Sequence, residues 1–385
     1  MLAVFALFLG ENFGFEAGVA SEIYTWFLTL VYFLPLFGGM AADKWGYSRM
    51  VVIGIFIMFA GYFLLAIPLG SGTMAVIAMG AALLLVSMGT GMFKGNLQVM
   101  VGNLYNDPKY ADKRDAGFSL FYMLINVGAL FAPTAAIKSM EWAQNSLGYS
   151  KAVSYHFAFA VACISVIASI CIYNLGKSTF AQVLAVKKEK KADAKPVEEM
   201  SPAETRERIV CLLLVFAVVI FFWMAFHQNG LTLTWFADEF TAREATGITG
   251  MEFNVLNLVW CIFMVFGICG LLTAPKDATG KSKLTNLALI VIPAAILVYT
   301  YMQHGNDTVA IDAPIFQQFN PCFVVALTPV SIALFGWLGR IGKEPKAPVK
   351  IGLGMLVAAV AYLLMTVSSI GLPATDHPNH CLIYT

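Results

Sequence analysis

The chain has 385 residues, of which 59% are hydrophobic and 12% are charged, and its formal net charge is +1. Soluble domains carry about 25% charged residues, so this composition excludes a soluble globular protein and predicts an integral membrane protein. The near-neutral charge indicates no particular partner beyond the lipid bilayer, and we expect no nucleic acid among the partners.

The long apolar stretches predict helices that cross the bilayer. Most are long enough to span it, and none shows the alternating pattern of a barrel strand. The first is only half a span. The predicted spans are about residues 1–9, 22–42, 50–69, 73–105, 115–137, 153–176, 209–238, 253–273, 285–303, 316–339 and 350–371.

The short loop GGMAADKWGYSR, residues 38–49, joins the second and third spans. Its glycines suit close helix packing and a tight turn, and Asp43 suits a helix cap or a pair with a base. We expect a structural and conformational role for Asp43, Gly46 and Arg49, without substrate contact.

Lys94 lies inside the fourth span, and uncharged sequence runs from Pro68 to Phe93 before it. An ionised group within a membrane helix is energetically costly and usually functional. The residue could also extend its ammonium to the interface, because about 20 uncharged residues already cross the bilayer core. The residues that share a helix face with Lys94 are Ser87, Gly91 and Gln98.

The next span carries a second polar stripe, formed by Ser119, Tyr122 and Asn126. After the sixth span, residues 177–206 form the one long charge-rich segment, which predicts a cytoplasmic linker without chemistry of its own. It separates an N-terminal bundle, residues 1–176, from a C-terminal bundle, residues 207–385.

Basic residues support this topology. With a cytoplasmic N-terminus, 20 of the 24 Lys and Arg residues lie in the inner loops, as the positive-inside rule requires. We therefore expect a multi-pass protein of the inner (plasma) membrane.

Trp223 and His227 are four residues apart, late in the long apolar stretch at 209–238. His227 is thus a second ionisable candidate within the membrane, although a neutral histidine that bonds a neighbouring helix explains the pattern equally well. Further on, Asn320 precedes Pro321 and by sequence alone indicates a helix cap.

Three motifs carry a resemblance to a known family: GTGMFKGN at 89–96, RDAGF at 114–118 and FSLFYMLINVGA at 118–129. In this order they resemble the signature of the proton-dependent oligopeptide transporters (POT/PTR2), a branch of the major facilitator superfamily. One departure is Gly95, where the family usually has proline. The loop at 38–49 is likewise similar to a loop of this superfamily.

The resemblance implies an incomplete two-bundle major facilitator fold, from part of helix 1 to helix 9, with two extra helices inserted at about 253–303. A Glu-x-x-Glu-Arg motif of the first family helix would precede Met1, and the tenth would begin near Leu382. The chain would therefore be truncated at both ends.

The implied function is a proton-coupled symporter that imports di- and tripeptides by alternating access, with small peptides and protons as partners. The implied substrate-binding residues are Lys94, Asn126, Tyr32, Trp223, Asn320 and Tyr122. His227 stands where the family usually has a glutamate that pairs with the lysine. Because histidine cannot neutralise an ammonium, we expect Lys94 and His227 to form a coupled proton site.

Two other functions stay open: a major facilitator transporter of another small solute, such as an anion or a drug, and a membrane protein that senses peptides without transport. We expect no enzyme, because no nucleophile, base and orienting group can be assembled. The cysteines lie singly and the histidines lack ligand spacing, so we expect no metal and no cofactor.

Overall fold

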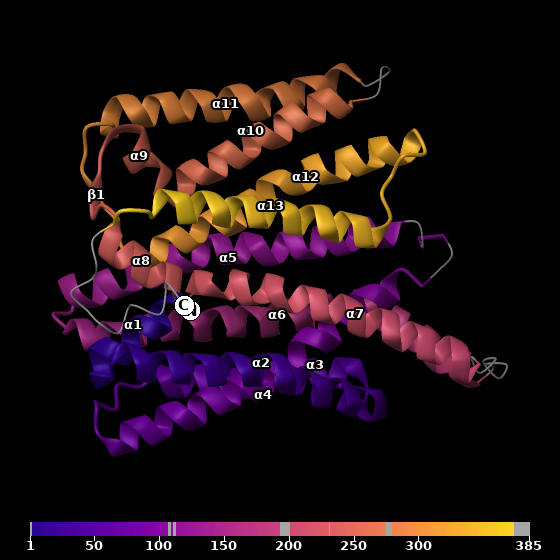
Figure 1. The fold of residues 1–385 in the computed structure, drawn as a ribbon, viewed down its shortest axis with the longest axis horizontal. Helices are drawn as coiled ribbons and strands as arrows, with labels where there is room; N and C mark the ends of the chain where they lie inside the picture. The colour runs from indigo at the N-terminus through magenta and orange to yellow at the C-terminus, as the bar shows by residue number, and fades with distance from the viewer. Residues whose placement is uncertain are drawn as a thin grey trace. The chain divides into compact units, whose positions relative to one another are not determined.

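Helices make up almost all of the structure, a computed structural model that describes residues 2–106, 109–110, 113–192, 201–230, 232–274 and 279–372 (Figure 1). Ten helical segments of these residues are long and apolar enough to cross a bilayer, and Val4–Phe13 is a shorter apolar helix. The prediction of an all-α, multi-pass membrane protein is confirmed.

The helices before the linker are α1 (Leu2–Phe13), α2 (Ala17–Trp45), α3 (Tyr47–Ala66), α4 (Thr73–Leu104), α5 (Arg114–Asn145) and α6 (Lys151–Ala192). The helices after it are α7 (Pro202–His227), α8 (Thr232–Phe240), α9 (Gly247–Glu252), α10 (Val255–Thr273), α11 (Gly280–His304), α12 (Phe319–Arg340) and α13 (Ala347–Ser368). Two 3₁₀ turns, η2 (Gln228–Gly230) and η3 (Ala313–Gln318), precede α8 and α12. A short antiparallel pair, β1 (Glu244–Ala245) with β2 (Val309–Ala310), links two loops.

The contacts divide the chain into two compact units. The first comprises Met1–Ala192, Glu252–Leu258 and Pro314–Val325, and the second comprises Asp193–Met251, Val259–Ala313 and Ala326–Thr385. The division into functional bundles at 1–176 and 207–385 stays a prediction.

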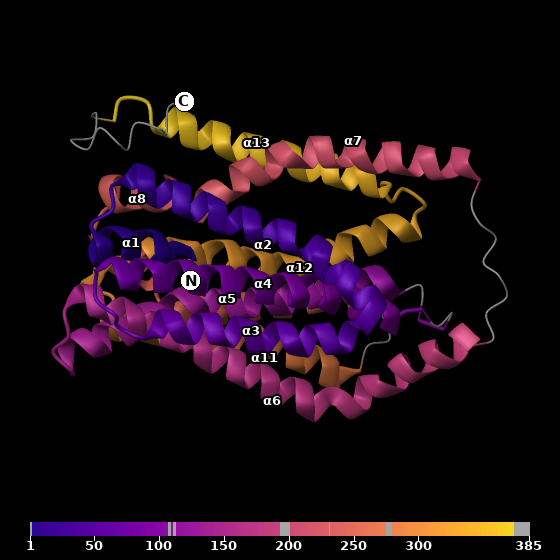
Figure 2. The ribbon, with the colours of Figure 1, turned by 90° about the horizontal axis from the view of Figure 1, so that it is seen from below.

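In the first unit, α4 packs against both α2 and α3 (Figures 1 and 2). Glycines set these contacts. A Cβ on Gly38 of α2 would collide with the carbonyl oxygen of Gly91, and a Cβ on Gly89 would lie 2.5 Å from the nitrogen of Met58 in α3. Small residues allow helix backbones to approach in lipid, where no hydrophobic driving force favours one apolar contact over another. Glycine spacing therefore fixes the position of α4.

The same unit buries α1 against α6. The ring of Phe8 in α1 packs edge-on against those of His156 and Phe159 in α6. The Nδ1 of His156 donates a hydrogen bond of 2.6 Å to the carbonyl of Leu65, near the end of α3. This bond satisfies a carbonyl that the last helical turn leaves without a partner in its own helix.

In the second unit, α10 and α11 form a hairpin. A Cβ on Gly267 would lie 2.6 Å from the carbonyl oxygen of Asn286, so the two helices touch through their backbones. The Tyr362 hydroxyl of α13 donates a 2.5 Å hydrogen bond to the carbonyl of Ala225 in α7. The two extra helices predicted between 253 and 303 are thus α10 and α11.

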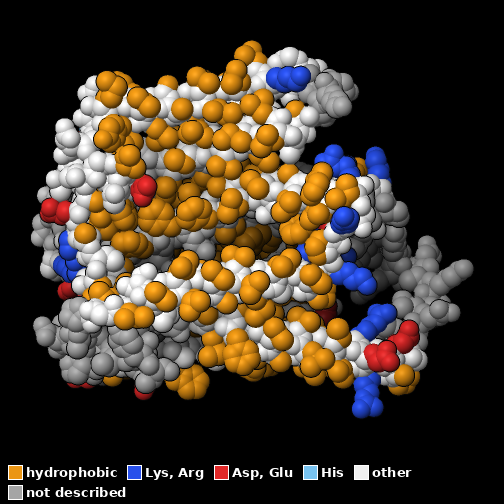
Figure 3. Space-filling view, turned by 45° about the horizontal axis from the view of Figure 1, so that its top comes forward, with side chains coloured by type: hydrophobic (Ala, Val, Ile, Leu, Met, Phe, Trp, Pro, Cys, Tyr) orange, Lys and Arg blue, Asp and Glu red, His pale blue; other side chains and the backbone are white. Residues whose placement is uncertain are grey.

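Apolar side chains cover most of the helical surface in view, whereas Lys and Arg gather near helix ends (Figure 3). Trp26, Phe56 and Leu272 are among the exposed large apolar residues. Such a surface suits lipid, because its side chains are apolar and the helices satisfy their own backbone hydrogen bonds.

Candidate functional site

The polar stripe predicted on α4 divides into a packed half and an open half. Ser87 is buried and its hydroxyl donates 2.8 Å to the carbonyl of Leu83 in its own helix. Gly91 is buried against Leu34 of α2. The side chains of Lys94 and Gln98 are exposed. Only the second half of the stripe is therefore free to meet a ligand.

Asn96 holds α4 to α2 beside Lys94. Its side chain is 1% exposed, and its Nδ2 donates 3.1 Å to the carbonyl of Gly38 and 2.8 Å to that of Met92. The GxxKxN spacing thus has a physical meaning. The glycine and the asparagine hold the backbone of α4 against α2, and the side chain of the lysine between them is exposed.

The ammonium of Lys94 lies over an aromatic ring. Its Nζ is 4.7 Å from the centre of the Tyr32 ring on α2. Such a cation–π contact stabilises the charge by about 0.5–2 kcal/mol, more as water is excluded. Tyr122 of α5 lies in the neighbourhood of Tyr32. Three predicted site residues, from three helices, therefore lie near one another.

Asn126 lies one turn after Tyr122 on α5. It is buried, and its Nδ2 donates 2.9 Å to the carbonyl of Tyr122. The amide therefore bonds its own helix, and its part in substrate binding stays a prediction.

The loop between α2 and α3 turns at Gly46, whose φ of 96° favours glycine. Asp43 accepts a 2.5 Å hydrogen bond from the hydroxyl of Tyr47. We expected Asp43 to cap a helix or to pair with a basic side chain. Its partner is instead the hydroxyl of Tyr47, four residues further along the chain. Arg49 is exposed in the first turn of α3. The conformational role of this loop stays a prediction.

The predicted helix over 209–238 is interrupted directly after His227. A 3₁₀ turn at Gln228–Gly230 separates α7 from α8. Glycine is a poor helix former, and the Thr232 hydroxyl donates to the Gln228 side chain across the turn. Trp223 stacks on His227 with ring centres 5.5 Å apart and planes at 25°. Their shared face is confirmed.

Trp223 and His227 belong to the second unit, whereas Lys94, Tyr32 and Asn320 belong to the first. The pairing of Lys94 with His227 therefore stays a prediction. Asn320 is exposed in the first turn of α12.

Sequence reasoning missed Gln318, which anchors the start of α12. Its side chain is 0% exposed, its Oε1 accepts a 3.3 Å hydrogen bond from Thr134 of α5, and its Nε2 donates 3.1 Å to the carbonyl of Phe253. Asn320 thus lies two residues after this buried and hydrogen-bonded glutamine. The sequence FQQFN gives no signal that distinguishes Gln318 from Gln317.

Comparison with known proteins gives the same family as the motifs. The family model described as "POT family" matches residues 48–193, from α3 to α6. The di-/tripeptide transporter of Lactococcus lactis subsp. lactis (strain IL1403) is 26% identical over 94% of this chain and 69% of its own length. Dipeptide and tripeptide permease B of Salmonella typhimurium is 27% identical over 94% of this chain and 67% of its own length.

Solved structures support the fold. The crystal structure of a POT family transporter in complex with 5-aminolevulinic acid superposes with a TM-score of 0.51 at 20% identity, over 99% of this chain and 75% of that one. The chain thus spans about two thirds to three quarters of the length of these three proteins. It is a multi-pass membrane protein that has part of the fold of these transporters and is similar in sequence to members of the POT family.

Proposed function

We propose that the protein is a proton-coupled symporter that imports di- and tripeptides, in which Lys94 binds the peptide carboxylate. The observation that carries this proposal is the ammonium of Lys94, exposed on a membrane helix and 4.7 Å from the centre of the Tyr32 ring. Within the part of the chain that the structure describes, no carboxylate forms an ion pair with this ammonium.

An ammonium in a membrane helix costs several kcal/mol unless a counter-ion or water compensates it. The carboxylate of a peptide supplies that counter-ion by a charge-assisted hydrogen bond. The rings and hydroxyls of Tyr32 and Tyr122 offer π faces and acceptors to the rest of the substrate. We further assign substrate contacts to Asn126, Trp223 and Asn320, on the strength of the family resemblance.

We also propose alternating access of two bundles, residues 1–176 and 207–385, joined by the linker at 177–206. The N-terminus would lie in the cytoplasm of a cell whose plasma membrane holds the protein. The distribution of Lys and Arg supports this orientation.

Purified protein in liposomes tests the function. We expect a labelled dipeptide to accumulate inside when the external pH is lowered, and unlabelled di- and tripeptides to compete, because protons moving down their gradient drive uptake. Uptake of anions or drugs without peptide competition would favour another major facilitator substrate. Peptide binding without any flux would favour a sensor.

The proton pathway is tested at His227. We expect His227→Gln to abolish accumulation driven by the pH gradient and to spare exchange of labelled for unlabelled peptide, because glutamine cannot accept a proton. The matched control is His304→Gln. His304 is exposed at the end of α11 and pairs with Asp307 at 2.8 Å. Full retention of gradient-driven uptake by His227→Gln would remove this histidine from the pathway.

A further inference from the structure

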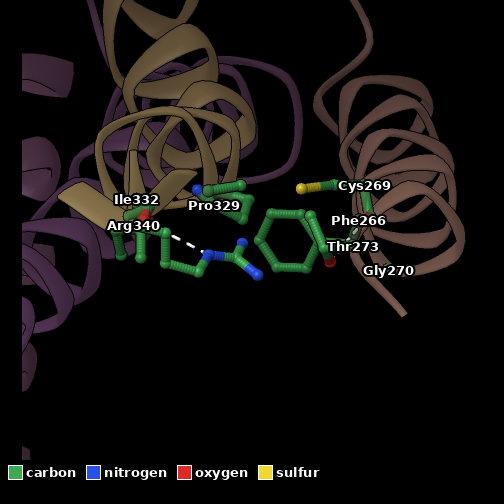
Figure 4. Close-up of a pocket in the computed structure, with 9 residues that line it drawn as sticks. Phe266, Cys269, Gly270, Thr273, Pro329, Ile332 and Arg340 are labelled. Carbon is green, nitrogen blue, oxygen red and sulfur yellow. Dashed lines mark hydrogen bonds between the residues drawn. The ribbon is translucent and has the colours of Figure 1, made fainter. Parts of the chain in front are cut away.

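A pocket of about 440 Å³ lies between α10 and α12 in the second unit (Figure 4). It is lined by one stripe of each helix, at spacings of three, four and seven residues. The residues that define it are Phe266, Cys269, Thr273, Pro329, Ile332 and Arg340. Its walls are mainly apolar, with a guanidinium and a hydroxyl near one end.

Small side chains leave the space between the two helices unfilled. Ala333 and Gly336 stand on the α12 wall, where larger side chains would fill the space. On the α10 wall, Gly270 faces the side chain of Asn286 in α11, so this part of α10 is committed to the hairpin. The inserted hairpin therefore meets α12 across a gap instead of by close packing.

The charge of Arg340 has no partner within the protein, as far as the structure describes it. Its Nε donates a long 3.4 Å hydrogen bond to the carbonyl of Gly336 in its own helix. The nearby carboxylate of Glu344 is engaged by Lys350 at 2.5 Å, and no ion pair includes Arg340. Figure 4 shows the guanidinium extending across the pocket toward the ring of Phe266.

We propose that this pocket binds an anionic phospholipid, with the phosphate on Arg340 and an acyl chain between α10 and α12. Guanidinium binds phosphate through two parallel hydrogen bonds, and the apolar walls suit a hydrocarbon chain. Lys343 and Lys346 follow Arg340 in the same loop. By the positive-inside rule this loop faces the cytoplasmic leaflet, which supplies anionic lipid.

A soluble phosphate would use Arg340 alone and leave the apolar walls exposed to water. The lipid uses both parts of the pocket. It also gives the inserted α10–α11 hairpin a function, because the acyl chain of the bound lipid fills the gap between α10 and α12.

Native mass spectrometry of the full chain tests the proposal. The detergent-purified protein is mixed with equal amounts of phosphatidylglycerol and phosphatidylcholine. We expect retention of phosphatidylglycerol over phosphatidylcholine, and about tenfold weaker retention in Arg340→Gln, as for one lost charge-assisted contact. Lys138→Gln, which removes an exposed basic residue that pairs with Glu141 and does not line the pocket, is the control and keeps wild-type retention.

A second variant leaves the charge in place. Ala333→Leu fills the pocket and is expected to reduce lipid retention, whereas Ser331→Leu, on the same helix outside the lining, does not. Equal binding of the two lipids, or unchanged retention in both pocket variants, would overturn the proposal. So would displacement of the lipid by equimolar glycerol phosphate, because that result assigns the site to a free phosphate.

Discussion

Lys94→Gln is expected to reduce gradient-driven uptake of a labelled dipeptide about thirtyfold or more. Removal of one member of a desolvated charge pair costs about 2 kcal/mol or more, and the substituted side chain cannot pair with the peptide carboxylate. The measurement is the initial rate of uptake into liposomes that contain equal amounts of folded protein.

The neighbouring tyrosine refines this prediction. Tyr32→Phe keeps the ring beneath the ammonium and is expected to retain most uptake, whereas Tyr32→Leu removes the cation–π contact and is expected to lose much of it. Lys138→Gln is the matched control, because Lys138 is an exposed lysine paired with Glu141 at 2.7 Å. Uptake by Lys94→Gln within twofold of the control would contradict the proposed role.

Gly38→Ala is expected to destabilise the protein by about 1–3 kcal/mol or more, as overpacking of a tight contact does. The added Cβ would collide with the backbone carbonyl of Gly91, so α2 and α4 must move apart. That movement would also break the bond from Asn96 to the Gly38 carbonyl. The measurement is the midpoint of thermal unfolding in detergent.

The adjacent residue is the control. A Cβ on Gly39 would have no neighbour within 4 Å, so Gly39→Ala is expected to leave the midpoint unchanged or slightly raised. The two variants make the same chemical change one residue apart. Equal stability of the two would mean that the glycine contact does not determine how α4 packs.

The membrane spans could be predicted from the sequence, because hydropathy and length decide which segments cross a bilayer. Lys94 could be recognised as a candidate for the same reason, since one charge within an apolar stretch is conspicuous. The shared face of Trp223 and His227 follows from helical spacing alone, and their stacked rings confirm it.

Contacts between helices could not be predicted. Sequence alone does not distinguish Gly38, where an added Cβ would collide with α4, from Gly39, where an added Cβ would meet no atom within 4 Å, because the difference depends on which face of α2 is turned toward α4. The bond from Tyr47 to Asp43 and the anchoring of Gln318 depend in the same way on tertiary geometry. The break after His227 depends on a local turn within an apolar segment that hydropathy treats as continuous.

Competition by a peptide without a carboxylate tests the central claim most directly. Dialanine and dialanine amide, which lacks the terminal negative charge, are compared as inhibitors of labelled dipeptide binding to the wild-type protein and to Lys94→Gln. If the ammonium of Lys94 pairs with the peptide carboxylate, the free acid binds the wild type much more tightly than the amide does, and the variant loses this preference. A wild-type protein that binds both equally, or a variant that still prefers the acid, would contradict the account.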